Sequence, residues 1–286
     1  MDVQNVVVVG AGTMGNGIAH VFALNGFDVL LIDTKQEYLD RALGTIQKNL
    51  ERQAQKGTIQ NSEVPGTLGR IKTSICIDDA RIADLAVEAV FENTEAKFDI
   101  FARLDKICRP DIILASNTSS ISVTGIGAKT KRPDKVVGMH FMNPVPLMKL
   151  VEMVRGLATS DATMKAGIDI ANRLGKTPVE VNDYPGFSTN RLLMPMINEA
   201  VYCLMEGVAS KESIDTCMRL GMNHPMGPLT LADFIGLDVC LDIMNVLHEG
   251  FADPKYRPCP LLRKMVKAGY LGRKTGRGFY IYEDKK

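Results

Sequence analysis

The stretch Val6–Gly17 reads Val-Val-Val-Val-Gly-Ala-Gly-Thr-Met-Gly-Asn-Gly, and it constrains the fold more than any other part of the chain. Four consecutive β-branched residues are typical of a strand buried on both faces, as in a parallel sheet. Gly10, Gly12 and Gly15 then follow in the pattern G-x-G-x-x-G, and an amphipathic stretch runs on to residue 25. A strand, a glycine turn and a helix in this order predict the opening unit of a dinucleotide-binding sheet.

Each glycine has its own physical reason. Gly10 permits the tight turn, Gly12 lets a pyrophosphate approach the backbone, and Gly15 lets the helix pack closely on the strand. Thr13 and Met14 begin the helix, whose N–H groups and positive dipole end would face the phosphates. We therefore expect these five residues to bind the cofactor.

Asp33 follows a second predicted strand, 28–32, and lies 23 residues after Gly10. A carboxylate at this place can accept hydrogen bonds from a ribose 2′-hydroxyl. It would repel a 2′-phosphate, so NAD is favoured over NADP, although Lys35 nearby acts in the other direction. The alternative interpretation is that Asp33 only caps the next helix.

The size and charge of the chain narrow the class of protein. At 286 residues it is long enough for two domains, and a net charge of +1 gives no reason to expect nucleic acid or a membrane surface as partner. The first residues enter a strand almost at once, which leaves no room for a signal peptide. The six cysteines form no C-x-x-C motif, so we expect reduced thiols and a cytoplasmic protein.

Strands and helices alternate up to about residue 182, which predicts a Rossmann-type doubly wound sheet. The expected strands are 6–9, 28–32, 71–74, 85–90, 111–115, 136–139, 148–154 and 177–181, with helices at 13–25, 34–55, 94–108 and 162–174 and a turn region at 61–69. The pattern changes at residues 183–186, so we expect an NAD-binding domain over 1–184 and a second domain over 185–286.

The second domain shows almost no strand signal. Its expected helices are 187–206, one capped by Ser210 and ending near Gly221, then 229–235, 237–248 and 260–268. This all-α domain has apolar surface left for self-association, so we expect a homodimer; a compact monomeric bundle is the alternative.

Polar residues gather where the expected strands end. The segments that contain them are Phe91–Asn93, Ser116–Ser120 and His140–Pro144. Ligands of open α/β sheets bind at this edge. Histidine titrates near neutrality and can exchange a proton with an alcohol. Glu152 lies on the next extended segment, so its carboxylate could meet the imidazole of His140 and fix its tautomer.

Taken together, these motifs resemble the L-3-hydroxyacyl-CoA dehydrogenase family, and most closely its bacterial members that act on 3-hydroxybutyryl-CoA. The likeness covers essentially the whole chain. The matching stretches are Val9–Gly15, Ala115–Ser120, His140–Pro146, Lys149–Glu152, Pro185–Leu193, Gly227–Leu229, Asp233 and the tail Gly272–Tyr280.

The resemblance implies NAD as cofactor, an acyl-CoA substrate and a His140–Glu152 dyad as general acid and base. It assigns Ser119 and Asn190 to the substrate oxygens. Glu92, Lys97, Asn117 and Asn143 match cofactor-contacting positions, and Lys56 is a candidate partner for a coenzyme A phosphate. Without the resemblance, Ser119 would be a helix N-cap, Asn190 a helix-surface amide and Lys97 a solvated lysine.

We therefore expect reversible NAD-dependent oxidation of (S)-3-hydroxyacyl-CoA, with 3-hydroxybutyryl-CoA as substrate, to the 3-oxoacyl-CoA. One alternative is a related dehydrogenase that acts on a hydroxy acid without coenzyme A. The other is a binding or structural relative that has lost turnover, which a broken dyad would favour.

Overall fold

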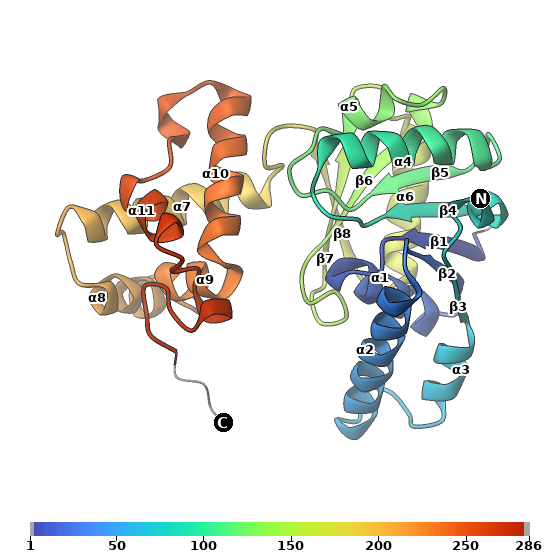
Figure 1. The fold of residues 1–286 in the computed structure, drawn as a ribbon, viewed down its shortest axis with the longest axis horizontal. Helices are drawn as coiled ribbons and strands as arrows, with labels where there is room; N and C mark the ends of the chain where they lie inside the picture. Colours follow the sequence, from blue (N-terminus) through green and yellow to red (C-terminus); the bar gives the residue numbers. More distant parts are fainter. Residues whose placement is uncertain (1–2, 283–286) are drawn as a thin grey trace. The chain divides into compact units, whose positions relative to one another are not determined.

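The computed structural model describes residues 3–282, which divide into two compact units between Tyr184 and Pro185. The first unit is a sheet with helices on both faces, and the second is helical (Figure 1). No helix within residues 3–282 is long and apolar enough to cross a membrane.

The sheet of the first unit has eight strands in the order β3-β2-β1-β4-β5-β6-β7-β8. Their bounds are β1 Asn5–Val9, β2 Asp28–Ile32, β3 Ile71–Ser74, β4 Leu85–Glu88, β5 Ile113–Ser116, β6 Val136–Phe141, β7 Leu150–Arg155 and β8 Thr177–Asn182. The first six strands are parallel in the doubly wound order 3-2-1-4-5-6, so the predicted fold class is confirmed.

The last two strands run against the other six, which the sequence did not indicate. β6 pairs with β7 antiparallel, and β7 pairs with β8 parallel. β6 also continues to Phe141, so His140 lies within the strand and not just beyond its end. The antiparallel neighbour extends β6, because Phe141 pairs with Val151 of β7.

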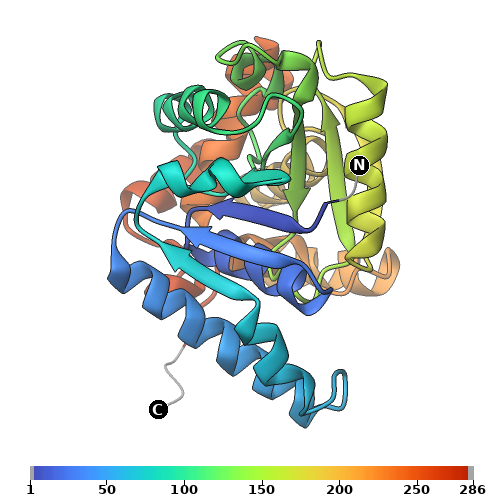
Figure 2. The ribbon, with the colours of Figure 1, turned by 90° about the vertical axis from the view of Figure 1, so that its right-hand side faces the viewer.

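Helices cover both faces of the sheet. They are α1 Thr13–Leu24, α2 Gln36–Gln55, α3 Glu63–Gly69, α4 Thr94–Ile107, α5 Val123–Gly127 and α6 Asp161–Arg173. Buried side chains of α1, α2 and α6 share one core with the strands. In Figures 1 and 2, α1 and α2 lie on one side of the sheet and α4 on the other. All four valines of β1 are buried, as their β-branched run predicted, and Val6 and Val8 belong to this core.

The turn region expected at 61–69 is wrong for most of its length, because α3 occupies Glu63–Gly69. Pro65 stands in the first turn of this helix, where a backbone N–H has no intrahelical partner to lose. Val64 and Leu68 pack against the core of the first unit. The proline and glycine content of this segment therefore suggested a turn, but the packing of its apolar face stabilises a helix.

The second unit contains α7 Thr189–Met205, α8 Lys211–Thr216, α9 Pro228–Ile235, α10 Leu237–Phe251 and α11 Pro260–Lys267, with a π-helical turn at Cys217–Gly221. Ser210 caps α8 by accepting from the backbone N–H of Ser213, as predicted. The buried carboxylate of Asp233 accepts from the backbone N–H groups of Phe279 and Tyr280, both at 2.9 Å, and so holds the end of the described chain on α9.

Candidate active site

A pocket of about 980 Å³ lies over the glycine turn of the first unit. It is lined by residues that follow β1, β2, β4 and β6, together with faces of α2 and α4. Five of the expected cofactor residues line it, namely Gly10, Gly12, Thr13, Asp33 and Asn143. The carboxyl ends of the parallel strands thus supply this pocket, as expected for a doubly wound sheet.

The three glycines differ in the space around them. Gly10 has φ +105°, and a Cβ there would lie 2.6 Å from the carbonyl oxygen of Ala89. A Cβ at Gly15 would clash with the carbonyl oxygen of Gly10. At Gly12, apart from its two chain neighbours and the start of its own helix, no heavy atom of the described chain lies within 4 Å of a Cβ. The protein thus leaves open the place that a pyrophosphate would take. The residues therefore fit a dinucleotide.

Asp33 joins the ends of β1 and β2. Its Oδ2 accepts from the backbone N–H of Ala11 at 2.7 Å, and its Oδ1 accepts from that of Thr34 at 2.6 Å. The alternative role as a helix cap is wrong, because Lys35 is the N-cap residue of α2 and makes no side-chain cap bond. The Asp33 carboxylate instead fixes the glycine turn and lines the pocket.

His140 and Glu152 face each other across the antiparallel pair of β6 and β7. Nδ1 of His140 lies 2.8 Å from Oε2 of Glu152, and both side chains are almost fully buried. The carboxylate accepts a hydrogen bond from Nδ1–H, so Nε2 is the nitrogen that can exchange a proton with a ligand. Asn143, which lines the pocket, follows shortly after β6.

Asn117 connects the site to β6. Its side-chain oxygen accepts from the backbone N–H of Phe141 at 2.9 Å, and its backbone N–H donates to the backbone carbonyl of Glu88. Asn117 therefore bridges the ends of β4 and β6 beside His140.

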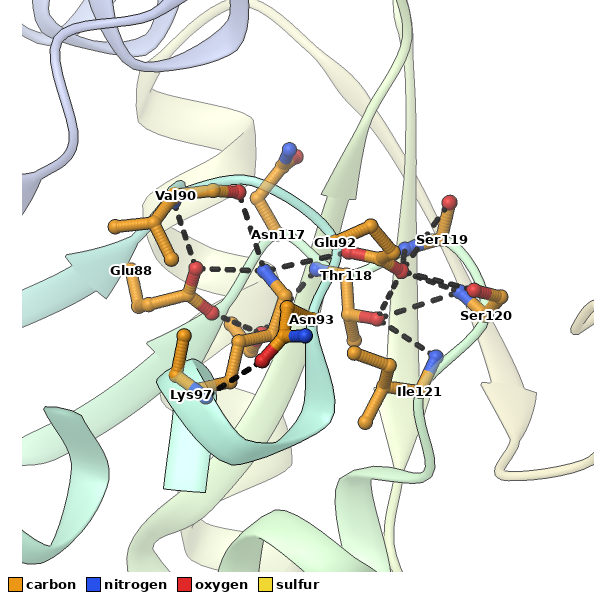
Figure 3. A network of polar contacts seen from close by, with 12 residues as sticks. Glu88, Val90, Glu92, Asn93, Lys97, Asn117, Thr118, Ser119, Ser120 and Ile121 are labelled. Atoms are coloured by element: carbon orange, nitrogen blue, oxygen red, sulfur yellow. Dashed lines mark hydrogen bonds and ion pairs between the residues drawn. The ribbon is translucent and has the colours of Figure 1, made fainter. Parts of the chain in front are cut away.

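Glu92 and Lys97 lie together at the start of α4 (Figure 3). The Lys97 ammonium is 3.3 Å from Oε2 of Glu92 and 2.6 Å from Oε1 of Glu88. Lys97 is fully buried, so its interpretation as a solvated lysine is wrong. Glu88 was not singled out from the sequence; a charged residue that ends the apolar strand Leu85–Glu88 was the available signal.

Ser119 lies in the loop after β5, where its backbone N–H donates to Oε1 of Glu92 at 2.8 Å. The N-cap role considered for it is wrong, because Ser122 caps α5 by accepting from Gly125 N–H. Burial alone would raise the pKa of Glu92. The Lys97 cation and the hydrogen bonds from Thr118, Ser119 and Ser120 outweigh it and leave that pKa below its usual value.

Lys176 is a further residue of this region, and no motif around it marked it in advance. Its ammonium donates to the carbonyl oxygens of Val145 at 2.6 Å and Met148 at 2.8 Å. These two hydrogen bonds restrain the loop that carries Asn143 and the pocket-lining residues Pro144–Pro146.

Two further expected substrate residues lie on helices α7 and α2. Asn190 belongs to the second unit, in the first turn of α7, and it is buried, so its interpretation as a helix-surface amide is wrong. Lys56 is the exposed C-cap residue of α2 in the first unit.

Comparison with known proteins gives consistent results over the whole chain. The model of the "3-hydroxyacyl-CoA dehydrogenase, NAD binding domain" matches residues 5–184, and that of the family's C-terminal domain matches residues 186–282. A "Probable 3-hydroxybutyryl-CoA dehydrogenase" of Bacillus subtilis is 57% identical over 285 residues, covering 100% of this chain and 99% of the relative.

A 3-hydroxybutyryl-CoA dehydrogenase of Bradyrhizobium diazoefficiens is 54% identical, covering 99% of this chain and 97% of the relative. Among solved structures, the (S)-3-hydroxybutyryl-CoA dehydrogenase of Ralstonia eutropha matches with a TM-score of 0.96 and 49% identity. That match covers 99% of this chain and 100% of the other.

Proposed function

The chain belongs to the 3-hydroxyacyl-CoA dehydrogenase family, and on that premise we propose that it interconverts (S)-3-hydroxybutyryl-CoA and acetoacetyl-CoA with His140 as general acid and base. It is an NAD-dependent oxidoreductase that acts on 3-hydroxyacyl-CoA thioesters. The observation that carries the assignment of His140 is its buried 2.8 Å contact with Glu152.

NAD, when bound, accepts the hydride that leaves C3 of the substrate. The fit of the pocket supports binding through the glycine turn and Asp33, with Met14 and Gly15 on the same helix start. Glu92, Lys97, Asn117 and Asn143 remain proposed cofactor positions, since they match the family's pattern.

In the oxidation direction, Nε2 of His140 takes the proton of the 3-hydroxyl group. The Glu152 carboxylate holds Nδ1–H and stabilises the imidazolium that forms. In reduction, the imidazolium returns the proton to the oxygen at C3. We assign Ser119 and Asn190 to the orientation of the substrate oxygens, and Lys56 to a phosphate of coenzyme A.

Steady-state kinetics with acetoacetyl-CoA and either NADH or NADPH test this function. Turnover with NADH, and little with NADPH, is the expected result. Turnover with NADPH alone would overturn the assignment of Asp33, and no turnover with either by folded protein would overturn the reaction. 3-Hydroxy acids without coenzyme A serve as the comparison substrates.

We also propose a cytoplasmic homodimer formed through the second unit. Several large apolar side chains of that unit are well exposed, including Leu192, Val208, Leu220 and Met222. Sedimentation equilibrium tests the dimer, for which a monomer mass at micromolar concentration is the contrary result. Cell fractionation with an activity assay tests the location.

A further inference from the structure

A buried ion pair lies under the loop that carries Ser119. The side chains of Glu88 and Lys97 are both 0% exposed, and their charged groups are 2.6 Å apart. Glu88 also accepts from the hydroxyl of Ser116 at 2.6 Å and from the backbone N–H of Val90 at 2.7 Å. Removing two charges from water is costly, and the close contact between them offsets this cost only in one geometry. The Glu88 carboxylate, itself fixed by these hydrogen bonds, therefore holds the Lys97 ammonium in one place.

The same ammonium reaches Glu92, whose side chain keeps 34% of its surface exposed. Lys97 has three N–H donors, and three oxygens surround them: Oε1 of Glu88 at 2.6 Å, Oε2 of Glu92 at 3.3 Å and the carbonyl of Val90 at 3.5 Å. The ammonium is thus directed at groups of the protein itself.

The other oxygen of Glu92 accepts several hydrogen bonds from the loop after β5. Oε1 accepts from the backbone N–H groups of Ser119 at 2.8 Å and Ser120 at 2.9 Å. It also accepts from the hydroxyls of Thr118 at 2.6 Å, Ser120 at 3.0 Å and Ser119 at 3.3 Å. Figure 3 shows these contacts converging on Glu92. One carboxylate therefore connects the buried lysine to the backbone of Ser119.

We propose that Lys97 is a positioning residue that fixes the Glu92 carboxylate, which in turn sets the loop conformation that aligns the Ser119 hydroxyl with the reacting substrate oxygen. This inference rests on the role of Ser119 in the proposed function. It gives Lys97 an effect on turnover through Glu92, in addition to any contact with the cofactor.

Loss of the ammonium leaves the carboxylates of Glu88 and Glu92 facing each other without a cation between them. Glu92 then turns toward solvent and releases the N–H groups of Ser119 and Ser120. A misplacement of about 1 Å at a reacting group can cost on the order of 100-fold in rate. The loss should appear in kcat more than in the affinity for NADH.

The test is a double-mutant cycle of Lys97→Met and Ser119→Ala, with kcat measured at saturating NADH and acetoacetyl-CoA. We expect each single variant to lower kcat about tenfold or more. The double variant should fall no more than about twofold below Ser119→Ala, because both act on the same hydroxyl. Lys106→Met, an exposed lysine on the same helix, is the matched control and should turn over like the wild type.

Amide hydrogen exchange of Ser119 and Ser120 gives a readout that does not depend on activity. Folded Lys97→Met should exchange these amides about tenfold faster or more, while Lys106→Met should not change them. If Lys97→Met does not fold, Glu92→Ala takes its place in both experiments, because Glu92 is partly exposed and its truncation removes the oxygen that accepts from the N–H groups of Ser119 and Ser120.

The outcomes separate the inference from the function on which it rests. Unchanged amide exchange, or fold-losses in kcat that multiply in the double variant, overturns the positioning role. A weaker affinity for NADH with normal kcat in Lys97→Met also overturns it and favours direct cofactor contact. A normal kcat in Ser119→Ala removes Ser119 from the proposed mechanism, and the catalytic part of the inference fails with it.

Discussion

Nδ1 of His140 lies 2.8 Å from Oε2 of Glu152, its direct partner across the β6–β7 pair. The contact follows from register: in an antiparallel pair, residues directly opposite place their side chains on the same face of the sheet. A slip of one residue would move Glu152 to the other face. The reversed direction of β7 is therefore part of how the fold builds this acid–base pair.

Glu152→Gln should lower kcat about tenfold to 100-fold while the Kd for NADH stays within about twofold of wild type. The amide keeps the shape but loses the charge that stabilises the imidazolium and fixes its tautomer. Stopped-flow kinetics and NADH fluorescence titration measure the two quantities. Glu180→Gln, on the neighbouring strand β8, is the control and should behave as wild type.

Asp33→Asn should raise the KM for NADH about tenfold and lower that for NADPH. The amide can still accept from the backbone N–H of Ala11, but it no longer offers a charged acceptor to a ribose hydroxyl or repels a 2′-phosphate. Asp40→Asn, on the exposed face of α2, should leave both constants unchanged. Unaltered preference for NADH in Asp33→Asn would contradict the role of this carboxylate.

Gly12→Ala should weaken NADH binding by more than about tenfold without loss of stability. Beyond its two chain neighbours and its own helix, the added methyl group meets no heavy atom of the described chain within 4 Å, yet it lies where the pyrophosphate approaches the backbone. Calorimetric titration and thermal unfolding separate the two effects. Gly44→Ala, in the middle of α2 with the same open space, should raise stability by roughly 0.5–1 kcal/mol and leave binding alone.

His20 should make the protein less stable as the pH falls from about 6.5 to about 4. It is fully buried in α1, and neither ring nitrogen has a partner at hydrogen-bond geometry among the described residues. Burial lowers its pKa from 6.5 to about 4 and outweighs the opposing effect of the nearby Gln53 side chain. Between these values the unfolded chain binds a proton that the folded chain does not, so the free energy of unfolding decreases with falling pH, by up to about 3 kcal/mol.

Denaturant unfolding of wild type and His20→Leu between pH 7 and pH 4 measures this contribution. As the pH falls, the free energy of unfolding of wild type should decrease relative to that of His20→Leu, because the variant has no histidine at this position to bind a proton on unfolding. His248→Leu, a half-buried histidine of α10, is the control. A constant difference across this range would show that His20 does not titrate with unfolding.

The strand β1, the glycine turn and the doubly wound fold class could be predicted because local patterns in the sequence indicate them. A run of valines and three spaced glycines permit few other conformations. The sequence also indicated that His140 and Glu152 could meet, since both fall on neighbouring extended segments. The roles of Ser119 and Asn190 came only from resemblance to a family.

The direction of β7 could not be predicted, because an apolar extended run reads the same in a parallel or an antiparallel neighbour. The burial of Lys97 was equally hidden. A lysine in the first part of a helix is normally solvated, and only the tertiary placement of Glu88 at the end of β4 makes a buried ammonium tolerable. Such long-range charge pairs leave no periodic signal in a sequence.

Single-turnover reduction of acetoacetyl-CoA by His140→Gln with prebound NADH tests whether His140 supplies the proton. We expect the variant to bind NADH with a Kd within about twofold of wild type. It should lose at least about 100-fold in the rate of hydride transfer, because no group remains to supply the proton. Hydride transfer at the wild-type rate by His140→Gln would contradict the assignment of His140 as the general acid and base.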